Sequence, residues 1–332
     1  MILVTGGTGL IGSHLLFQLA KSGHNIRAIY RSKKSLDKVA KVFGYYTETP
    51  SQLLEKISWV QADITDVASL AEAFKGVHYV YHSAALISFD PRQLDDLIKS
   101  NTEGTANIVN LCVAHKVKKL CYVSSIAAIG KGTKGKISTE NNEWTDTNVS
   151  VYGLTKHDAE LEVWRGSLEG LPVVVVNPGV VFGPGFWRSG SGSFFTYANK
   201  GKKSFLPGGT GFVSVNDVTK AMITLMESDI ERERFILVSE NLSYREILTR
   251  IAQKLKVQEP IKQAPFWALE LFWRWDGLRS KLFGKRRRLT KNMVKGFYHQ
   301  ETYSAEKIRT LLDFEFEDLD DILTFCCEKF EN

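Results

Sequence analysis

Tyr152 and Lys156 are the two residues of this chain whose types and spacing most clearly suggest chemistry. They lie four residues apart in Val151-Tyr-Gly-Leu-Thr-Lys156, so a helix over this segment would place both side chains on one face, one turn apart. A free phenol keeps its proton to about pH 10, and a cation a few ångströms away stabilises the phenolate. We therefore expect Lys156 to lower the pKa of Tyr152 and to make it a usable proton donor or acceptor.

A glycine-rich stretch near the start of the chain indicates a cofactor for this chemistry. Thr5-Gly-Gly-Thr-Gly-Leu-Ile-Gly12 follows a short β-branched run and opens a helical pattern. There, glycines permit a tight turn and let backbone N–H groups approach a pyrophosphate at the helix N-terminus. A structural turn that binds no phosphate is the alternative. The residues assigned to this dinucleotide site are Thr5, Gly6, Gly9, Leu10, Ile11 and Gly12.

The residues after the second predicted strand bear on the identity of the dinucleotide. An NAD site usually has Asp or Glu about 20 residues beyond the glycines, where the carboxylate binds the ribose 2′-hydroxyl. This chain has Tyr30-Arg-Ser-Lys-Lys34 there, and the first acid is Asp37. Arg31, helped by Lys34 or its neighbours, could instead bind a 2′-phosphate. NADP(H) is therefore preferred and NAD(H) remains possible, with a solvated basic loop as the alternative.

Two later strand ends are also predicted to contact the dinucleotide. Asp63 and Ile64 follow the third strand, where Asp63 could accept a hydrogen bond from the adenine amino group and Ile64 could pack on the ring. Asp63 could equally cap the next turn. After the fourth strand, the small residues Ser83, Ala84 and Ala85 would let the backbone lie close against the nicotinamide half.

The pattern of apolar runs predicts the elements that position these residues. Short β-branched runs at 2–4, 25–30, 57–60, 78–82, 120–123 and 173–177 alternate with helical patterns at 10–22, 67–75, 94–115 and 151–168, and 35–56 has the character of an extended crossover. This alternation predicts an α/β fold, a Rossmann-like doubly wound parallel sheet. We expect residues 1–177 to form a dinucleotide-binding domain with the catalytic residues. Residues 178–332 should form mostly a smaller substrate-binding lobe, with some segments returning to the Rossmann core.

Composition and charge exclude several classes of protein. The chain has 332 residues, 43% of them hydrophobic, which is ample for a packed core. Its four cysteines and seven histidines show no ligand spacing, so we expect no metal site. The net charge of +6 does not require nucleic acid. Apolar runs are too short to span a bilayer, and a strand beginning near Met1 leaves no secretory signal, so we expect a cytoplasmic location.

A series of motifs across the first 184 residues resembles the extended short-chain dehydrogenases/reductases of the NAD-dependent epimerase/dehydratase superfamily. Stretches around 213–218 and 303–314 also resemble the C-terminal pattern of that family. The resemblance implies a Rossmann-like fold and hydride transfer. Besides the glycine motif, the motifs are Asp63-Ile, His82-Ser-Ala-Ala, Asn101-Thr-Glu-Gly-Thr105, Val123-Ser-Ser-Ile-Ala-Ala-Ile-Gly130, Tyr152-Gly-Leu-Thr-Lys156 and Asn177-Pro-Gly-Val-Val-Phe-Gly-Pro184.

The resemblance also implies a catalytic set. The family's serine corresponds to Ser125, five residues before Gly130, and its hydroxyl would bind the substrate oxygen. Tyr152 would donate a proton to that oxygen, or remove one in the reverse direction. Lys156 would bind the hydroxyls of the nicotinamide ribose. The other residues expected near the cofactor are Ser124, Pro178, Gly179 and Val180.

Two departures from the family pattern favour a reductase over a sugar-nucleotide epimerase or dehydratase that retains its cofactor. One is the missing acid after the second strand. The other is Val180, because sugar-nucleotide enzymes commonly have an asparagine there for the substrate diphosphate. We expect NADP(H)-linked reduction of a fairly apolar ketone or aldehyde, or the reverse oxidation, as in dihydroflavonol 4-reductase-like and 3β-hydroxysteroid dehydrogenase-like members. The side chains that could line the substrate site, unless they are core, are Phe89, Phe182, Phe186 and Phe212.

A non-catalytic function on the same fold is a further alternative. Some proteins of this type bind a dinucleotide and act as sensors or assembly factors, and these usually lack the tyrosine or the lysine. This chain has both Tyr152 and Lys156, which favours an enzyme.

Two surfaces could bind partners other than a small-molecule substrate. In the family, helices equivalent to 94–115 and 151–168 pair between two subunits. The resemblance therefore implies a homodimer, although the same apolar positions could pack on the sheet. Residues 265–288 combine an aromatic helical pattern with a basic stretch and could contact a membrane surface peripherally. We favour the alternative, a helix that packs over the substrate pocket or in the core of the lobe.

Overall fold

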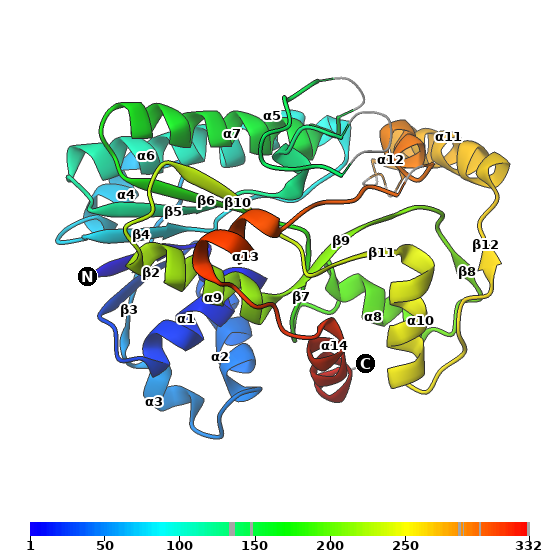
Figure 1. Cartoon of the computed structure of the whole chain (residues 1–332), viewed down its shortest axis with the longest axis horizontal. Coiled ribbons are helices and arrows are strands. Elements are labelled where there is room, and N and C mark those ends of the chain that lie inside the picture. Colours follow the sequence, from blue (N-terminus) through cyan, green and yellow to red (C-terminus); the bar gives the residue numbers. More distant parts are fainter. Residues whose placement is uncertain (133–136, 147–148, 285–286, 288, 299, 331–332) are drawn as a thin grey trace.

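The centre of the fold is a seven-stranded parallel sheet (Figure 1). The computed structural model describes residues 1–132, 137–146, 149–284, 287, 289–298 and 300–330. The strand order is β10-β6-β5-β4-β1-β2-β3, and every neighbouring pair is parallel. The strands are β1 (Ile2–Thr5), β2 (Ile26–Tyr30), β3 (Ile57–Gln61), β4 (Tyr79–His82), β5 (Lys119–Val123), β6 (Val173–Pro178) and β10 (Glu233–Leu237).

The predicted doubly wound sheet is confirmed, with strand ends within about two residues of those expected. Strand β10 was not predicted. Its first two residues, Glu233 and Arg234, are charged, and it pairs only with β6 at the edge of the sheet. An edge strand with a charged start lacks the continuous apolar run that identified the inner strands.

Helices cover both faces of the sheet because successive strand side chains point to opposite sides. On one face, side chains such as Val4 pack with α1 (Leu10–Lys21), α9 (Val215–Glu227) and α13 (Glu306–Leu312). On the other, side chains such as Leu3 pack with α4 (Val67–Ala73), α6 (Gly104–Ala114) and α7 (Val151–Leu168). In Figure 1 the second group lies above the sheet, with α1 and α9 below it.

Two predicted segments contain more detail than the sequence indicated. The helix expected at 94–115 consists of α5 (Leu94–Leu97), a π-helical turn (Ile98–Glu103) and α6. The crossover at 35–56 contains α2 (Leu36–Gly44) and α3 (Pro50–Leu54). By contrast, α7 has the predicted bounds.

The chain after β6 builds a smaller lobe, on the right of Figure 1, and also returns to the central sheet. The lobe contains a mixed sheet of β7 (Val180–Phe182), β9 (Gly209–Ser214) and β11 (Glu240–Ser243), and a short pair, β8 (Ser204–Phe205) with β12 (Lys262–Gln263). Elements α9, β10 and α13 belong to the central sheet and its cover. The helices of the lobe are α8 (Gly192–Asn199), α10 (Tyr244–Lys254), α11 (Phe266–Phe283), α12 (Lys291–Gly296) and α14 (Leu319–Lys329).

The length and hydropathy of the helices bear on membrane insertion. Over the residues that the structure describes, none is at once long enough and apolar enough to cross a bilayer.

Candidate active site

The glycine loop makes a tight connection between β1 and α1. Gly6 has a φ of 71°, a left-handed conformation that favours glycine, and a Cβ on it would lie 2.5 Å from the backbone nitrogen of Ala84. A Cβ on Gly12 would clash with the carbonyl oxygen of Gly6. Gly9 N donates to Gly6 O at 2.9 Å, and α1 begins at the next residue, Leu10. At Gly6 and Gly12, neighbouring backbone atoms therefore occupy the space that a side chain would need.

This loop lies at the point where the order of the strands reverses. The chain runs outward from β1 to β3 and then crosses to β4 on the other side of β1, and ligands of open α/β sheets bind at such a switch point. Ser83 Oγ donates to Thr5 O at 2.7 Å and Ala84 N to Thr5 Oγ1 at 3.4 Å, which holds the end of β4 against β1. A helix N-terminus beside closely approaching backbone fits the pyrophosphate of a dinucleotide.

The residues expected to select the dinucleotide lie beyond the carboxyl ends of β2 and β3. Arg31 and Lys34 are exposed, in the loop that leads into α2. Asp63 Oδ1 accepts from both N and Oγ1 of Thr65 at 3.0 Å. Asp63 therefore caps the turn that follows β3, which was the alternative to an adenine contact. Ile64 is mostly buried in the hydrophobic core of the α4, α6 and α7 face.

The first turn of α7 places Tyr152 beside Ser125. Ser150 Oγ accepts from Gly153 N at 3.0 Å and caps the helix. A Cβ on Gly153 would lie 2.8 Å from Ala127 O, so glycine allows α7 to approach the turn after β5. Within that turn Ser125 Oγ accepts from Ala127 N at 3.1 Å, and it lies near enough to the Tyr152 phenol to oppose the rise of its pKa. The structure thus brings the predicted serine and tyrosine close together.

Ser124, the neighbouring hydroxyl, is bound elsewhere. Its Oγ donates to Oε2 of Glu160 at 2.7 Å, and Asn177 Nδ2 donates to the same oxygen at 3.0 Å and to Ser125 O at 3.1 Å. Glu160 is fully buried, so one carboxylate holds together the ends of β5 and β6. Glu160 was not predicted as a site residue. Its position, four residues after Lys156 on one helix face, is the signal that could have found it.

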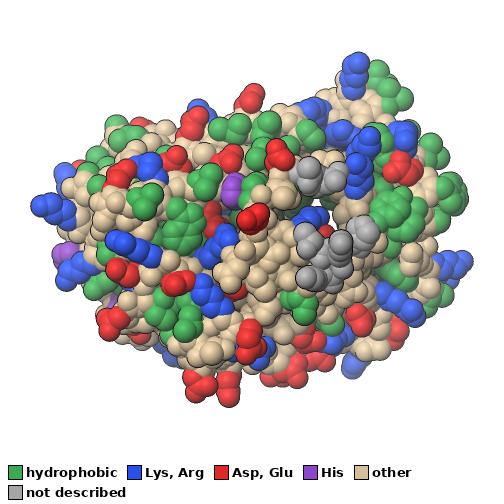
Figure 2. Space-filling model, turned by 45° about the horizontal axis from the view of Figure 1, so that its top comes forward, with side chains coloured by type: hydrophobic (Ala, Val, Ile, Leu, Met, Phe, Trp, Pro, Cys, Tyr) green, Lys and Arg blue, Asp and Glu red, His purple; other side chains and the backbone are tan. Residues whose placement is uncertain are grey.

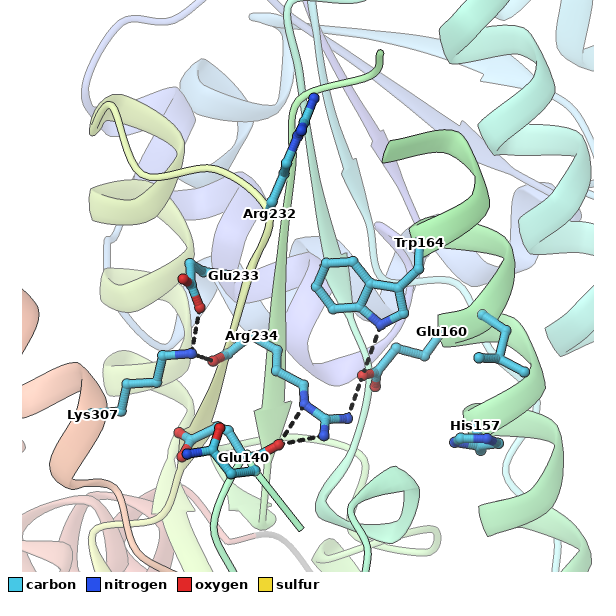
Figure 3. A pocket seen from close by; sticks show the side chains of 10 residues that line it. Glu140, His157, Glu160, Trp164, Arg232, Glu233, Arg234 and Lys307 are labelled. Atoms are coloured by element: carbon cyan, nitrogen blue, oxygen red, sulfur yellow. Dashed lines mark hydrogen bonds and ion pairs between the residues drawn. The ribbon is translucent and has the colours of Figure 1, made fainter. Parts of the chain in front are cut away.

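Glu160 also lines a polar cavity beside α7, with a volume of about 410 Å³ (Figure 3). Arg234 Nη1 donates to Glu160 Oε1 at 3.0 Å, and the same guanidinium donates to the backbone oxygen of Glu140. Lys307 forms an ion pair with Glu233 in the same cavity. None of the three predicted catalytic side chains lines it. The polar groups drawn in Figure 3 bond largely to one another. The cavity therefore belongs to the hydrogen-bonded packing that holds α7 in place.

Lys156 is buried and bonds to strand β5. Its Nζ donates to the Tyr122 hydroxyl at 2.6 Å and to Val123 O at 2.8 Å. Burial lowers the pKa of Lys156 to about 7, although the Glu160 carboxylate acts in the opposite direction. Tyr122 was not predicted as a site residue. Strand alternation puts it on the α7 face of β5, but its contact with the lysine depends on how closely α7 packs.

The pKa of Tyr152 corrects an expectation drawn from the sequence. Lys156 was expected to lower it, but burial raises the pKa of Tyr152 to about 12, and the nearby Ser125 opposes this rise only in part. The Lys156 ammonium bonds instead to Tyr122 and Val123. Desolvation of the phenolate therefore outweighs charge stabilisation in this arrangement.

A line of buried polar side chains connects Lys156 with β1. The Tyr122 hydroxyl lies near Thr105. Thr105 Oγ1 lies 3.0 Å from His82 Nε2, and His82 Nδ1 lies 2.6 Å from Thr5 Oγ1. Burial lowers the pKa of His82 to about 3, with a smaller contribution from the Lys156 charge. The imidazole is therefore neutral near neutral pH and links the two ends of the line without adding charge.

The aromatic residues predicted to line a substrate site separate into two groups. Phe89 is 41% exposed and packs edge-on against the Tyr152 ring, with centroids 5.6 Å apart. Phe182 and Phe212 are 0% exposed, and their rings stack in the core of the lobe with centroids 5.5 Å apart. They are therefore core residues, which was the alternative to lining the substrate site. Phe186 lies beside Lys38 of α2. Of these four aromatic residues, only Phe89 has a ring contact with a predicted catalytic side chain.

The remaining predicted positions connect the sheet with the lobe. Pro178 ends β6, Gly179 N donates to Leu237 O at 3.0 Å, and Val180 begins β7. Across the described ranges, no group of three or more His, Cys, Asp or Glu side chains is arranged to hold a metal ion.

Residues 2–237 match the model of a family described as the NAD dependent epimerase/dehydratase family. The chain belongs to this family. It is 31% identical over 267 residues to tetraketide alpha-pyrone reductase 2 of Arabidopsis thaliana, covering 76% of this chain and 82% of that protein. It is 26% identical over 281 residues to a putative dihydroflavonol 4-reductase of Synechocystis, covering 82% and 77%. These relatives confirm the predicted NAD(P)-dependent oxidoreductase of the extended short-chain dehydrogenase/reductase type.

Another relative and two solved structures extend the comparison. Sterol demethylase protein B of Methylococcus capsulatus is 28% identical over 251 residues, covering 74% of this chain and 72% of that protein. The crystal structure of gox2253 has a TM-score of 0.82 and 25% identity, covering 99% of this family member and 97% of that chain. UDP-glucose 4-epimerase from Thermotoga maritima has a TM-score of 0.76 and 20% identity, covering 99% of this chain and 97% of that chain. This likeness shows a shared fold.

Proposed function

We propose that this family member is an NADP(H)-dependent reductase of a ketone or aldehyde, or a dehydrogenase of the corresponding alcohol, acting on a fairly apolar small molecule. The observation that carries the proposal is the exposed ring of Phe89, which packs edge-on against Tyr152, with Ser125 near the same phenol. Two neighbouring hydroxyls beside an apolar ring can bind the carbonyl oxygen of an apolar molecule. The reductases among its relatives support the same reaction type.

Each catalytic side chain has a separate role in this proposal. A bound nicotinamide supplies or accepts a hydride. Ser125 hydrogen-bonds the substrate oxygen, and Tyr152 donates its proton to that oxygen or removes it in the reverse direction. With a pKa of about 12, the phenol is protonated at neutral pH, which is the state needed to donate. Lys156 binds the nicotinamide ribose through its ammonium.

The cofactor is proposed to be NADP(H), held by the loop from Thr5 to Gly12. Arg31 and Lys34 are exposed, and they supply positive charge for a 2′-phosphate where an NAD enzyme usually has an acid. The other residues proposed to contact the cofactor are Asp63, Ile64, Ser83, Ala84, Ala85, Ser124, Pro178, Gly179 and Val180.

Dissociation constants of NADPH and NADH test the choice of cofactor. The wild type should bind NADPH more tightly, and Arg31→Glu should weaken NADPH binding by about 10-fold or more, because a charge-assisted hydrogen bond contributes about 1.5–3 kcal/mol. Lys56→Glu is the matched control, since Lys56 is exposed in the turn before β3. A wild-type preference for NADH would contradict the assignment.

A panel of ketones, aldehydes and alcohols, followed by absorbance of the nicotinamide, tests the reaction. Turnover should be accompanied by net oxidation or reduction of the cofactor. Tyr152→Phe should lower kcat by about 100-fold or more and leave NADPH binding intact. Sugar-nucleotide turnover without net change of the cofactor would refute the reductase assignment, and an unchanged cellular phenotype of Tyr152→Phe would favour a sensor or assembly role.

We also propose a division of labour and an oligomeric state. Residues 1–177 form the cofactor-binding domain, and residues 178–332 supply mostly the substrate-binding lobe while α9, β10 and α13 complete the central fold. A homodimer pairs α6 and α7 of two copies, and the exposure of Leu161 on α7 supports this. Light scattering tests this pairing. The wild type should be a dimer, and Leu161→Asp should weaken dimerisation.

A further inference from the structure

We propose that the outer face of α11, with the basic residues around it, docks on the surface of an anionic lipid membrane. The proposal does not depend on the reductase assignment. Five large apolar side chains form the α11 stripe, and each is between 55% and 72% exposed. They follow one another at intervals of four, four, three and four residues, the spacing of a single helix face. The α11 stripe consists of Trp267, Leu271, Trp275, Leu278 and Leu282.

The opposite face of α11 is already packed against the protein. Leu269 belongs to a small core with Leu289 and Val294, and Leu289 N donates to Asp276 Oδ2 at 3.2 Å. Arg92 donates to Ser280 O at 3.3 Å. Because the inner face is anchored in this way, the exposed stripe is not the core-facing side of the helix. An apolar stripe of this size on a surface marks an interaction site.

The charge around α11 indicates what covers the stripe. Residues 266–298 contain nine Lys and Arg against two Asp and Glu, a net charge of +7, whereas the whole chain carries +6. The remainder of the protein is therefore close to neutral, and its excess positive charge is concentrated here. By helical spacing Arg274 and Lys281 border one edge of the stripe. Figure 2 shows hydrophobic and basic side chains next to one another on the right side of the molecule.

An anionic lipid surface fits this combination better than a second copy of the chain. In a two-fold symmetric dimer the same patch meets itself, so two segments of charge +7 would face each other, which is unfavourable. A membrane presents negative headgroups to the lysines and arginines and acyl chains to the stripe. Tryptophan is favoured at such an interface because its ring is apolar and its N–H is polar.

The docking surface adjoins the candidate active site. Asn292, at the start of α12, donates to Val149 O at 3.1 Å, three residues before Tyr152. Arg287 N donates to Asp90 Oδ2 at 3.0 Å, next to Phe89. A protein docked through α11 would therefore hold the Tyr152 region close to the membrane surface.

Flotation with lipid vesicles tests the proposal. Wild-type protein should float with vesicles of phosphatidylcholine and phosphatidylglycerol in equal amounts, and bind vesicles of phosphatidylcholine alone more weakly. The triple variant Trp267→Ser/Leu271→Ser/Leu278→Ser should lower partitioning by about 100-fold or more, from the loss of apolar area. Arg274→Glu/Lys281→Glu should lower binding to the anionic vesicles and reduce its sensitivity to salt.

A matched variant separates a specific surface from general exposed hydrophobicity. Val67→Ser/Leu168→Ser/Leu311→Ser removes three side chains that are 50%, 90% and 54% exposed on other helices and should leave flotation unchanged. Thermal unfolding and NADPH binding without vesicles show whether each variant is folded, so loss of flotation in a folded protein supports the proposal even if the reductase assignment fails. The proposal is overturned if the wild type stays with the unbound fraction. It is equally overturned if the matched Val67/Leu168/Leu311 variant loses flotation to the same degree as the triple α11 variant. A third contrary result would be that the triple α11 variant is a monomer where the wild type is a dimer, while neither protein binds vesicles.

Discussion

The Nζ atom of Lys156 lies 2.6 Å from the hydroxyl oxygen of Tyr122, on the strand beside α7. Lys156 shares its helix with Tyr152, but in the structure its bonds go to Tyr122 and to Val123 O. The lysine is thus held against the centre of the sheet, where burial lowers its pKa to about 7. Burial at this position makes the charge of Lys156 sensitive to pH in the range where enzymes work.

The pH dependence of activity follows from that pKa. If Lys156 must be charged to bind the ribose, kcat/KM should fall as pH rises through about 7, since kcat/KM reports groups of the free enzyme. Initial rates from acid to mildly alkaline pH, with subsaturating substrate, measure it. A profile that is flat through neutral pH would count against an essential ammonium.

Stability should change with pH in the opposite sense. The pKa of Lys156 is about 7 in the folded protein and 10.5 for an unperturbed lysine, as in the unfolded chain. Between these limits the unfolded chain binds more protons, so the free energy of unfolding rises with pH. Below about pH 7 the full cost of a buried ammonium is present. Lys156→Met removes this cost, so its stability gain over wild type should be larger in mildly acidic than in alkaline buffer. Thermal unfolding of both proteins across that range checks the sign.

Tyr122→Phe should move the alkaline limb of kcat/KM to lower pH. The substitution removes an acceptor for the Lys156 ammonium and leaves the ring in place, so the charged form loses stabilisation. Tyr81→Phe is the matched control, because Tyr81 is a buried tyrosine on the adjacent strand β4 that faces the opposite side of the sheet. Equal profiles for the two variants would show that Tyr122 does not position the lysine.

The two adjacent serines should respond differently to alanine. Ser125 lies near Tyr152, and its loss should lower kcat by about 100-fold, as for other donors to a reacting oxygen. Ser124 donates to Glu160, so Ser124→Ala should lower stability by about 1 kcal/mol with a smaller effect on kcat. Steady-state kinetics and denaturant unfolding distinguish the two. The reverse order of kcat losses would reassign the substrate contact to Ser124.

Gly153→Ala should misalign Tyr152 without unfolding the protein. The added Cβ would meet Ala127 O at 2.8 Å and push α7 away from Ser125, and a shift of about 1 Å at a reacting group can cost about 100-fold in rate. Gly44→Ala, at the end of α2, is the control because a Cβ there meets nothing within 4 Å. We expect reduced kcat only for Gly153→Ala. Unchanged kinetics in that variant would mean that α7 adjusts without moving the phenol.

Glu160→Gln should destabilise the protein by roughly 3 kcal/mol, because it leaves Arg234 without its buried carboxylate. Glu162→Gln on the same helix is the control. Glu162 pairs with Arg165 at a partly exposed site, where such pairs contribute about 0–1 kcal/mol. Urea unfolding compares the two. Similar losses would show that Glu160 does not support the site more than a surface carboxylate.

Local pattern accounts for the parts that the sequence predicted well. The first six strands and α7 were predictable because apolar periodicity and turn residues specify local structure directly. The glycine loop was predictable because the steric demands of Gly6 and Gly12 arise within a few residues of β1 and from the strand that packs next to it. Even so, the π-helical turn before α6 and the edge strand β10 left no clear local signal.

Sequence alone determined the fold class, the family and the pairing of Tyr152 with Lys156 on one helix face. Tertiary structure decided which neighbour each functional group meets: Lys156 bonds to Tyr122, Ser125 faces Tyr152, and Ser124 is held by Glu160. It also decided burial, which raised the pKa of Tyr152, enclosed Phe182 and Phe212, and left the α11 stripe exposed. The physical reason is that periodicity is a property of neighbours along the chain, whereas desolvation and hydrogen-bond partners depend on elements far apart in sequence.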